Sequence, residues 1–102
     1  MNEIDLRNLL AAIVSASALL DHGRIGEDER GALRSNIQAN FDLADRLGIP
    51  YSVQNAAIFA GRKLDMGRES AQSKARQIIR ENADRLTAEH RAEWREYRLA
   101  HV

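Results

Sequence analysis

The sequence contains no cysteine, a single proline and few aromatic residues, which make up 5% of its 102 residues. Without cysteine the chain has no disulfide bond, no thiolate metal ligand and no cysteine nucleophile. The longest stretch without a charged residue, 8–20, is too short to span a bilayer, and the first residues lack the basic region of a signal peptide. We therefore expect one domain, residues 1–102, in the cytoplasm and without a membrane contact.

The chain also lacks a net charge, with 15 basic and 15 acidic residues. The signs are unevenly distributed, because residues 1–48 hold five basic and eight acidic residues whereas residues 49–102 hold ten and seven. This mild asymmetry provides no strongly basic surface of the kind that binds nucleic acid through bulk charge. It would instead orient two copies head to tail, or attract an acidic partner toward the C-terminal half.

No segment shows the period-two alternation of a strand, and apolar residues recur in steps of three and four throughout. Gly23 supplies a helix C-terminus, and Gly48 followed by an apolar residue and proline supplies a second. Ser52 and Ser70 are suitable N-caps. The sequence predicts four helices, at about residues 5–22, 27–47, 52–65 and 70–99.

The first and last of these helices set the expected architecture. The first has almost no polar face and should be buried nearly all round. The last contains no glycine or proline from Ser70 to Leu99, so an uninterrupted helix would be about 45 Å long, against about 30 Å for the others. We expect an all-α, four-helix bundle-like domain whose long C-terminal helix projects past the core, unless Thr87 caps a new helix and the tail folds back.

Residues that carry catalysis or bind metals are not arranged for either task. The three histidines, His22, His90 and His101, do not occur in Glu-x-x-His or His-x-x-x-His spacing. There is no nucleophile elbow for a serine and no glycine-rich phosphate loop. We expect a protein that is not an enzyme and that uses neither a metal nor another cofactor.

The C-terminal helix carries the most informative pattern. Most of its arginines fall on one flank of an apolar seam and its glutamates fall on the other, with Arg85 among them, as in helices that orient a partner helix. Trp, Tyr and Arg are the residue types most enriched at binding hot spots. The residues expected to contact a protein partner are Arg91, Trp94, Arg95, Tyr97 and Arg98. This pattern predicts a small interaction protein, either a homodimer or an inhibitor or adaptor of a larger complex. Inhibitors and adaptors carried by phages or plasmids belong to this class.

Three alternatives remain open. The flank could be an ordinary solvated face of the monomer, with arginine stems covering Trp94. It could lie along nucleic-acid phosphates, using Arg76, Arg80, Arg91, Arg95 and Arg98. Residues 43–49 also resemble the first half of a helix-turn-helix, which would extend over 43–60, although Gln54 stands where that motif has an apolar residue. The third alternative is a buried small-ligand pocket lined by Phe41, Phe59 and the first helix.

Overall fold

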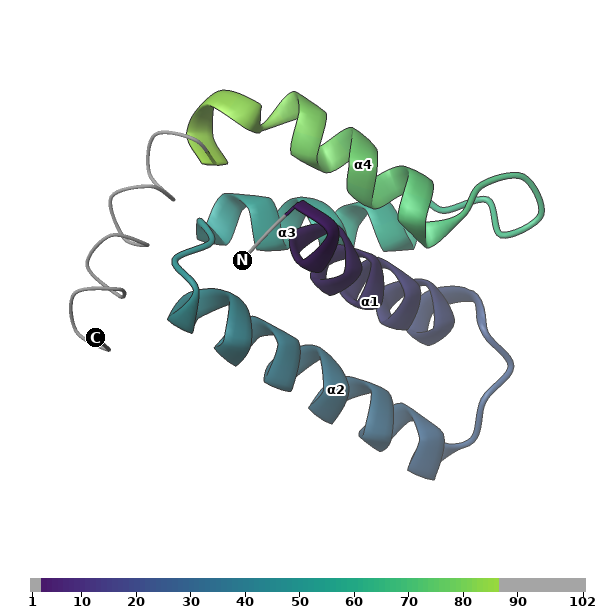
Figure 1. The fold of residues 1–102 in the computed structure, drawn as a ribbon. Coiled ribbons are helices and arrows are strands. Elements are labelled where there is room, and N and C mark those ends of the chain that lie inside the picture. The colour runs from purple at the N-terminus through teal and green to yellow at the C-terminus, as the bar shows by residue number, and fades with distance from the viewer. Residues whose placement is uncertain (1–2, 87–102) are drawn as a thin grey trace.

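The computed structural model describes residues 3–86, which are helical apart from short connections and contain no strand (Figure 1). The all-α prediction is thereby confirmed. The helices are α1 (Glu3–His22), α2 (Glu27–Arg46), α3 (Tyr51–Arg62) and α4 (Ala71–Glu81).

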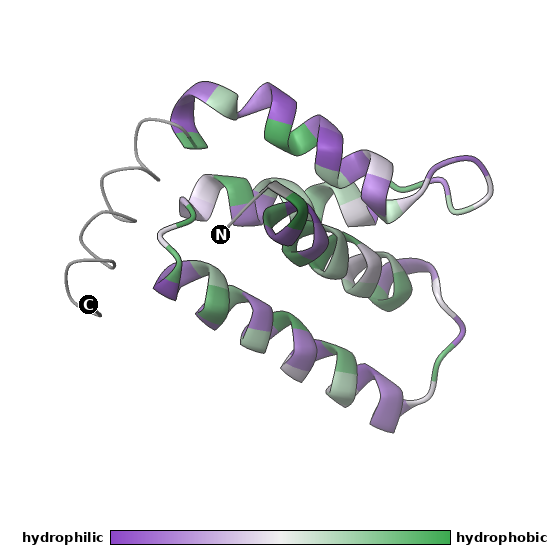
Figure 2. Cartoon of the chain, in the orientation of Figure 1, coloured by the Kyte–Doolittle hydropathy of each residue, from purple (hydrophilic) through white to green (hydrophobic). Residues whose placement is uncertain are grey.

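Helix α1 is the centre of the fold, because α2, α3 and α4 each pack against it (Figure 1). Helices α2 and α4 do not contact each other, and α3 touches α2 only slightly. Leu10, Ile13 and Val14 of α1 are fully buried. Figure 2 shows why α1 takes this position, since hydrophobic residues follow one another along it while α2 and α4 are interrupted by hydrophilic ones. Its nearly continuous apolar surface can be buried only by neighbours on several sides.

Helix α1 is buried over most of its circumference, as predicted, but one side of it faces solvent. Ser15 is exposed, Ile4 is 56% exposed, and Ala12 and Leu19 are only partly buried. These residues lie on the side of α1 between α2 and α4. Because α2 and α4 do not meet, no described element covers this side.

The joint between α2 and α3 follows the predicted capping chemistry. Gly48 adopts a positive φ of 74°, a conformation that glycine takes without steric cost. The amide of Ile49 donates to the carbonyl oxygen of Ala44 at 3.0 Å, and the amide of Gly48 donates to Asp45 O at 3.1 Å. This pair of bonds is a Schellman motif, which satisfies the last carbonyl groups of α2.

Helix α3 differs from the prediction at both ends. It begins at Tyr51 with Pro50 as its N-cap residue and ends at Arg62, rather than extending over 52–65. Ser52 therefore lies in the first turn and is not the cap. Its hydroxyl instead accepts a hydrogen bond of 2.6 Å from the Arg85 guanidinium.

Helix α4 begins as predicted but does not continue as one helix to residue 99. Ser70 is its N-cap, and the Ser70 hydroxyl accepts a 3.1 Å hydrogen bond from the Ser73 amide. The helix ends at Glu81, a turn follows at Asn82, and helical backbone resumes over 83–86. The Asn82 side chain donates to Ile78 O at 2.8 Å, a local bond with which asparagine competes against regular helix geometry.

This interruption removes the length argument for a projecting helix. With 11 residues, α4 spans about 16 Å, whereas a helix of α1's length spans about 30 Å. The prediction of an uninterrupted helix over 70–99 is therefore wrong at Asn82. Thr87 and the rest of that predicted helix lie outside the described residues.

Candidate functional site

Two of the predicted contact residues fall within the part of the chain that the structure describes. Arg76 and Arg80 lie one turn apart on α4, and both are exposed. Neither has an ion-pair partner among residues 3–86. The other predicted contact residues lie outside the described residues: Arg91, Trp94, Arg95, Tyr97 and Arg98.

Helix α3 presents an aromatic and cationic surface that the sequence did not lead us to expect. Tyr51 is 66% exposed and Phe59 is 53% exposed. The Arg62 guanidinium lies 5.7 Å from the centroid of the Phe59 ring, within cation–π range. No acidic residue occurs in α3. This surface therefore combines large apolar side chains with one guanidinium group, which also pairs with Asp21 at 3.8 Å.

The opposite side of α3 explains this exposure. Val53, Gln54, Ala57 and Gly61 are buried, and α3 packs mainly on α1. A helix that turns these residues inward must turn Phe59 outward. The four-residue step from Val53 to Ala57 was the available signal, but the apolar character of Phe59 suggested burial instead.

In residues 43–60, which resemble a helix-turn-helix, several side chains of α3 are buried against the rest of the domain. Gln54 is 1% exposed and bonds within the protein, to Asp45 and Ile49. Ala57 is fully buried. The side of α3 that remains accessible offers Tyr51, Phe59 and the short polar side chain of Ser52. Its one long polar side chain, Arg62 in the last turn, is paired with Asp21, so this side presents little that could read base edges.

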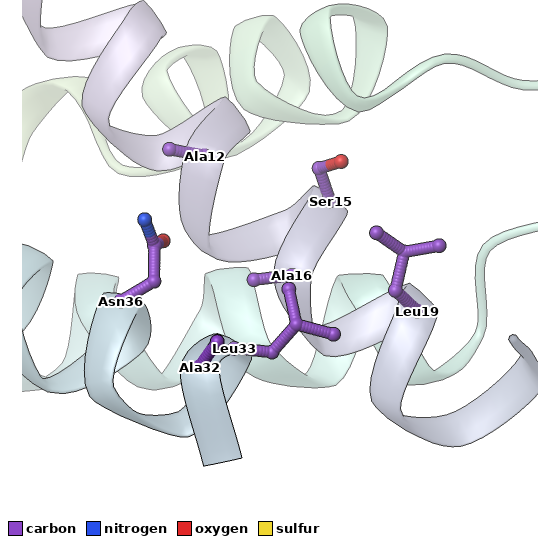
Figure 3. Close-up of a pocket in the computed structure, with 7 residues that line it drawn as sticks. All are labelled: Ala12, Ser15, Ala16, Leu19, Ala32, Leu33 and Asn36. Carbon is purple, nitrogen blue, oxygen red and sulfur yellow. The ribbon is translucent and has the colours of Figure 1, made fainter. Parts of the chain in front are cut away.

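An open groove of about 400 Å³ lies between α1 and α2 (Figure 3). None of the side chains that line it is charged, and most are small or apolar. Such a groove can accept apolar side chains from another helix. Its lining residues are Ala12, Ser15, Ala16 and Leu19 of α1 and Ala32, Leu33 and Asn36 of α2.

A smaller cavity of about 160 Å³ lies where α1, α2 and α3 meet. Its lining includes Ser17, Leu20, Ile37 and Ile58. The predicted ligand pocket was placed against Phe41 and Phe59, and this prediction is wrong in its residues. Phe41 is partly buried against the core and Phe59 is exposed, and neither lines this cavity.

Within residues 3–86, no three acidic or histidine side chains come together in a way that could hold a metal ion. His22 instead makes a structural contact, in which its Nε2 lies 2.6 Å from the carbonyl oxygen of Arg62 and ties the end of α1 to the end of α3. None of the described helices combines the length and apolar content that crossing a bilayer requires.

Compared with models of protein families, with curated proteins and with solved structures, the chain matches none of them.

Proposed function

We propose that this chain is a small non-catalytic protein that acts by binding another protein, either a second copy or a larger complex. In the second case it serves as a stoichiometric inhibitor or adaptor of the kind that phages and plasmids carry. The observation that carries the proposal is the composition of residues 91–98, which hold the only tryptophan, one of two tyrosines and three arginines. These are the residue types that dominate binding energy at protein interfaces.

The described residues support this proposal independently of helix length. Tyr51 and Phe59 expose large aromatic surfaces on α3, and the groove between α1 and α2 has an uncharged lining. Exposed aromatic and apolar surface on one small domain favours association with other proteins.

The homodimer version is tested by light scattering of the purified chain. We expect twice the 11.5 kDa chain mass at a concentration of about 100 μM, in the micromolar range of a weak interface. The double variant Trp94→Ala/Tyr97→Ala should scatter as a single chain. Tyr51→Ala removes the other tyrosine, which is exposed on α3, and locates the contact: an unchanged mass beside a single-chain double variant assigns the interface to residues 91–98, and a halved mass assigns it to α3.

A monomeric wild type would eliminate the homodimer version and leave the version with a different partner. That version is tested by affinity capture from the organism that encodes the chain. A protein retained by the wild type and by Tyr51→Ala, but not by Trp94→Ala/Tyr97→Ala, would support it. Equal retention by all three would place the contact elsewhere.

A second candidate function, nucleic-acid binding along the arginine flank, is favoured by one observation. Arg76 and Arg80 are exposed and have no ion-pair partner among residues 3–86, so both are available for phosphates. Fluorescence anisotropy with single- and double-stranded DNA at low salt tests this candidate. Each lost phosphate contact should reduce the slope of log affinity against log salt by about 0.9 on duplex DNA.

The variant Arg76→Gln/Arg80→Gln should therefore bind more weakly and with a shallower salt dependence. Arg34→Gln is the control, because Arg34 is exposed on α2 and also lacks an ion-pair partner among the described residues. No binding by the wild type at low salt would eliminate this candidate.

A further inference from the structure

Helix α2 is covered less well than α3 by the rest of the domain. Ala44 is the only one of its 20 residues that is buried, whereas α3 buries four of 12. Leu33, which lines the groove between α1 and α2, is only partly buried, and Leu43 is 38% exposed. A helix with an apolar side normally buries that side, so within residues 3–86 α2 retains apolar surface without a cover.

This uncovered surface continues along both helices as two uncharged stripes, in which residues recur in steps of three and four and therefore share one side of a helix. Eight of the 20 residues of α2 are charged, but none of those in its exposed stripe, which consists of Ala32, Asn36, Ala39 and Leu43. The stripe on α1, exposed or partly buried throughout, consists of Ile4, Asn8, Ala12, Ser15 and Leu19. We call the two stripes together the α1–α2 face.

The α1–α2 face has a hollow at one end and a ridge at the other. The hollow is the 400 Å³ groove, which lies between the second half of α1 and the first half of α2 (Figure 3). Ile4 and Leu43, 56% and 38% exposed, form the ridge at the opposite end, because α1 and α2 run in opposite directions (Figure 1). Each lies eleven residues, or about three turns, from a groove residue of its own helix and hence on the same side of it. These groove residues are Ser15 and Ala32.

A ridge and a hollow on one face fit a second copy of the same face. Rotation by 180° about an axis that crosses both helices, between the hollow and the ridge, would lay α1 on α1 and α2 on α2, each pair antiparallel. Ile4 and Leu43 of each copy would then enter the groove of the other copy, which is the reciprocal contact of a two-fold interface. Ala12 and Ala39 lie near this axis, where their small side chains allow the helices to approach closely.

Charges at the edge of α2 favour the same antiparallel arrangement. Asp28 and Arg46 are separated by eighteen residues, which is about five turns, so they lie on one side of α2 at its two ends. Both are exposed, and neither has an ion-pair partner among residues 3–86. In the antiparallel dimer Asp28 of each copy would lie beside Arg46 of the other copy. These two pairs of opposite charge would fix the orientation.

We propose that the α1–α2 face binds a second copy of the chain across this two-fold axis. Two neighbouring helices offer a face of about 25 Å by 20 Å, or about 500 Å², which is at the low end for a specific interface. The dimer should therefore dissociate in the micromolar range. The proposal rests on the version of the proposed function in which residues 91–98 bind a larger complex, because it places self-association on a different surface.

Light scattering at about 100 μM tests this face with Leu43→Glu, which would place a charge in each of the two apolar grooves. We expect a dimer for the wild type and a single chain for this variant. Phe59→Glu is the matched control, because it introduces the same charge at an exposed apolar residue of α3, and it should remain dimeric. Trp94→Ala/Tyr97→Ala should also remain dimeric, which separates this proposal from a dimer formed through residues 91–98.

Charge reversal tests the antiparallel arrangement without placing a charge in the groove. Asp28→Arg and Arg46→Asp should each weaken the dimer about tenfold, because each replaces two pairs of opposite charge by two pairs of like charge. An equimolar mixture of the two variants should associate with the wild-type affinity, since in the mixed dimer both pairs are again opposite in charge. Far-UV circular dichroism checks that each variant keeps the helical fold.

The proposal is overturned by a monomeric wild type, by a Leu43→Glu variant that stays dimeric, or by a mixture that associates no more tightly than either charge variant alone. A single-chain mass for Phe59→Glu or for Trp94→Ala/Tyr97→Ala would also overturn it, because self-association would then use α3 or residues 91–98. Failure of the proposed function is a separate result, since it is measured by affinity capture of the larger complex and not by the mass of the chain.

Discussion

The side-chain amide of Gln54 joins α3 to the end of α2. Its Nε2 donates to Oδ1 of Asp45 at 2.9 Å and to the carbonyl oxygen of Ile49 at 3.0 Å. Because Gln54 is 1% exposed, both bonds are held against the core. A polar residue at a buried position thus fixes the angle at which the chain leaves the Schellman motif of α2 and enters α3.

We expect Gln54→Leu to destabilise the domain by about 1–3 kcal/mol, although leucine has a similar size. The Ile49 carbonyl would lose its donor in a buried position, whereas the exposed Asp45 carboxylate would be solvated. Urea unfolding followed by circular dichroism measures this loss. Gln38→Leu is the control, since exposed Gln38 bonds only to Asp42, and it should change stability by less than about 0.5 kcal/mol. Equal stability of the two variants would contradict the structural role of Gln54.

The α2–α3 joint also shows what could be predicted from the sequence. Gly48, Ile49 and Pro50 specify a helix end through local chemistry, and the structure has the corresponding bonds. The burial of Gln54 depends on Asp45, nine residues away, so no local pattern reveals it. The sequence showed only that glutamine occupies position 54, where a helix-turn-helix has an apolar residue.

The helix faces also divide into those that a local sequence pattern predicts and those that depend on tertiary structure. The amphipathic face of α4 was predictable, because Ala75 and Ile78 are buried as their spacing requires. The break at Asn82 was not, since asparagine is only slightly unfavourable in helices and Asn40 makes the same kind of side-chain bond within the unbroken α2. The uncovered side of α1 depends on how far apart α2 and α4 lie, which is a tertiary property.

Gly61→Ala and Gly31→Ala should have opposite effects on stability. At Gly61 the new methyl group would lie 2.5 Å from the backbone oxygen of Val14, so α3 would have to shift away from α1, at a cost of about 1–3 kcal/mol. At Gly31, within α2, a methyl group meets nothing within 4 Å. There alanine should stabilise the domain by about 0.5–1 kcal/mol through its helix propensity.

Chemical denaturation of both glycine variants, measured side by side, tests this prediction. The same chemical change is made in two helices, so a difference in sign reports the tertiary contact alone. If Gly61→Ala is as stable as the wild type, α3 does not pack on α1 at the distance that the structure shows.

Ser70→Ala should lower the stability of α4. The Ser70 hydroxyl accepts from the Ser73 amide and donates to the Ser73 hydroxyl, and loss of an N-cap of this kind costs about 1 kcal/mol. Amide hydrogen exchange should accelerate first in α4. Ser35→Ala in the exposed middle of α2 serves as the control, and an equal effect of the two substitutions would contradict the capping role.

Asn82→Ala should convert the end of α4 into a continuous helix. The amide of Asn82 already donates to Ile78 O at 3.0 Å, and Leu86 N already donates to Asn82 O at 2.9 Å. Helical hydrogen bonds therefore lie on both sides of Asn82, whose own φ of −114° departs from the helix, and we propose that its side-chain bond to Ile78 O holds this conformation. Alanine removes the competing bond to Ile78 and has the higher helix propensity, so the domain should gain about 0.5 kcal/mol.

Carbon chemical shifts of residues 80–86 measure this change directly, because helical backbone moves Cα and carbonyl shifts in one direction. Asn40→Ala is the control, since Asn40 lies within the unbroken α2 and its side chain also bonds back by four residues, to Asn36 O. Both substitutions raise helix propensity, but only Asn82→Ala should alter the shifts of its neighbours. Unchanged shifts would mean that packing of the buried Leu86, rather than the Asn82 side chain, imposes the break.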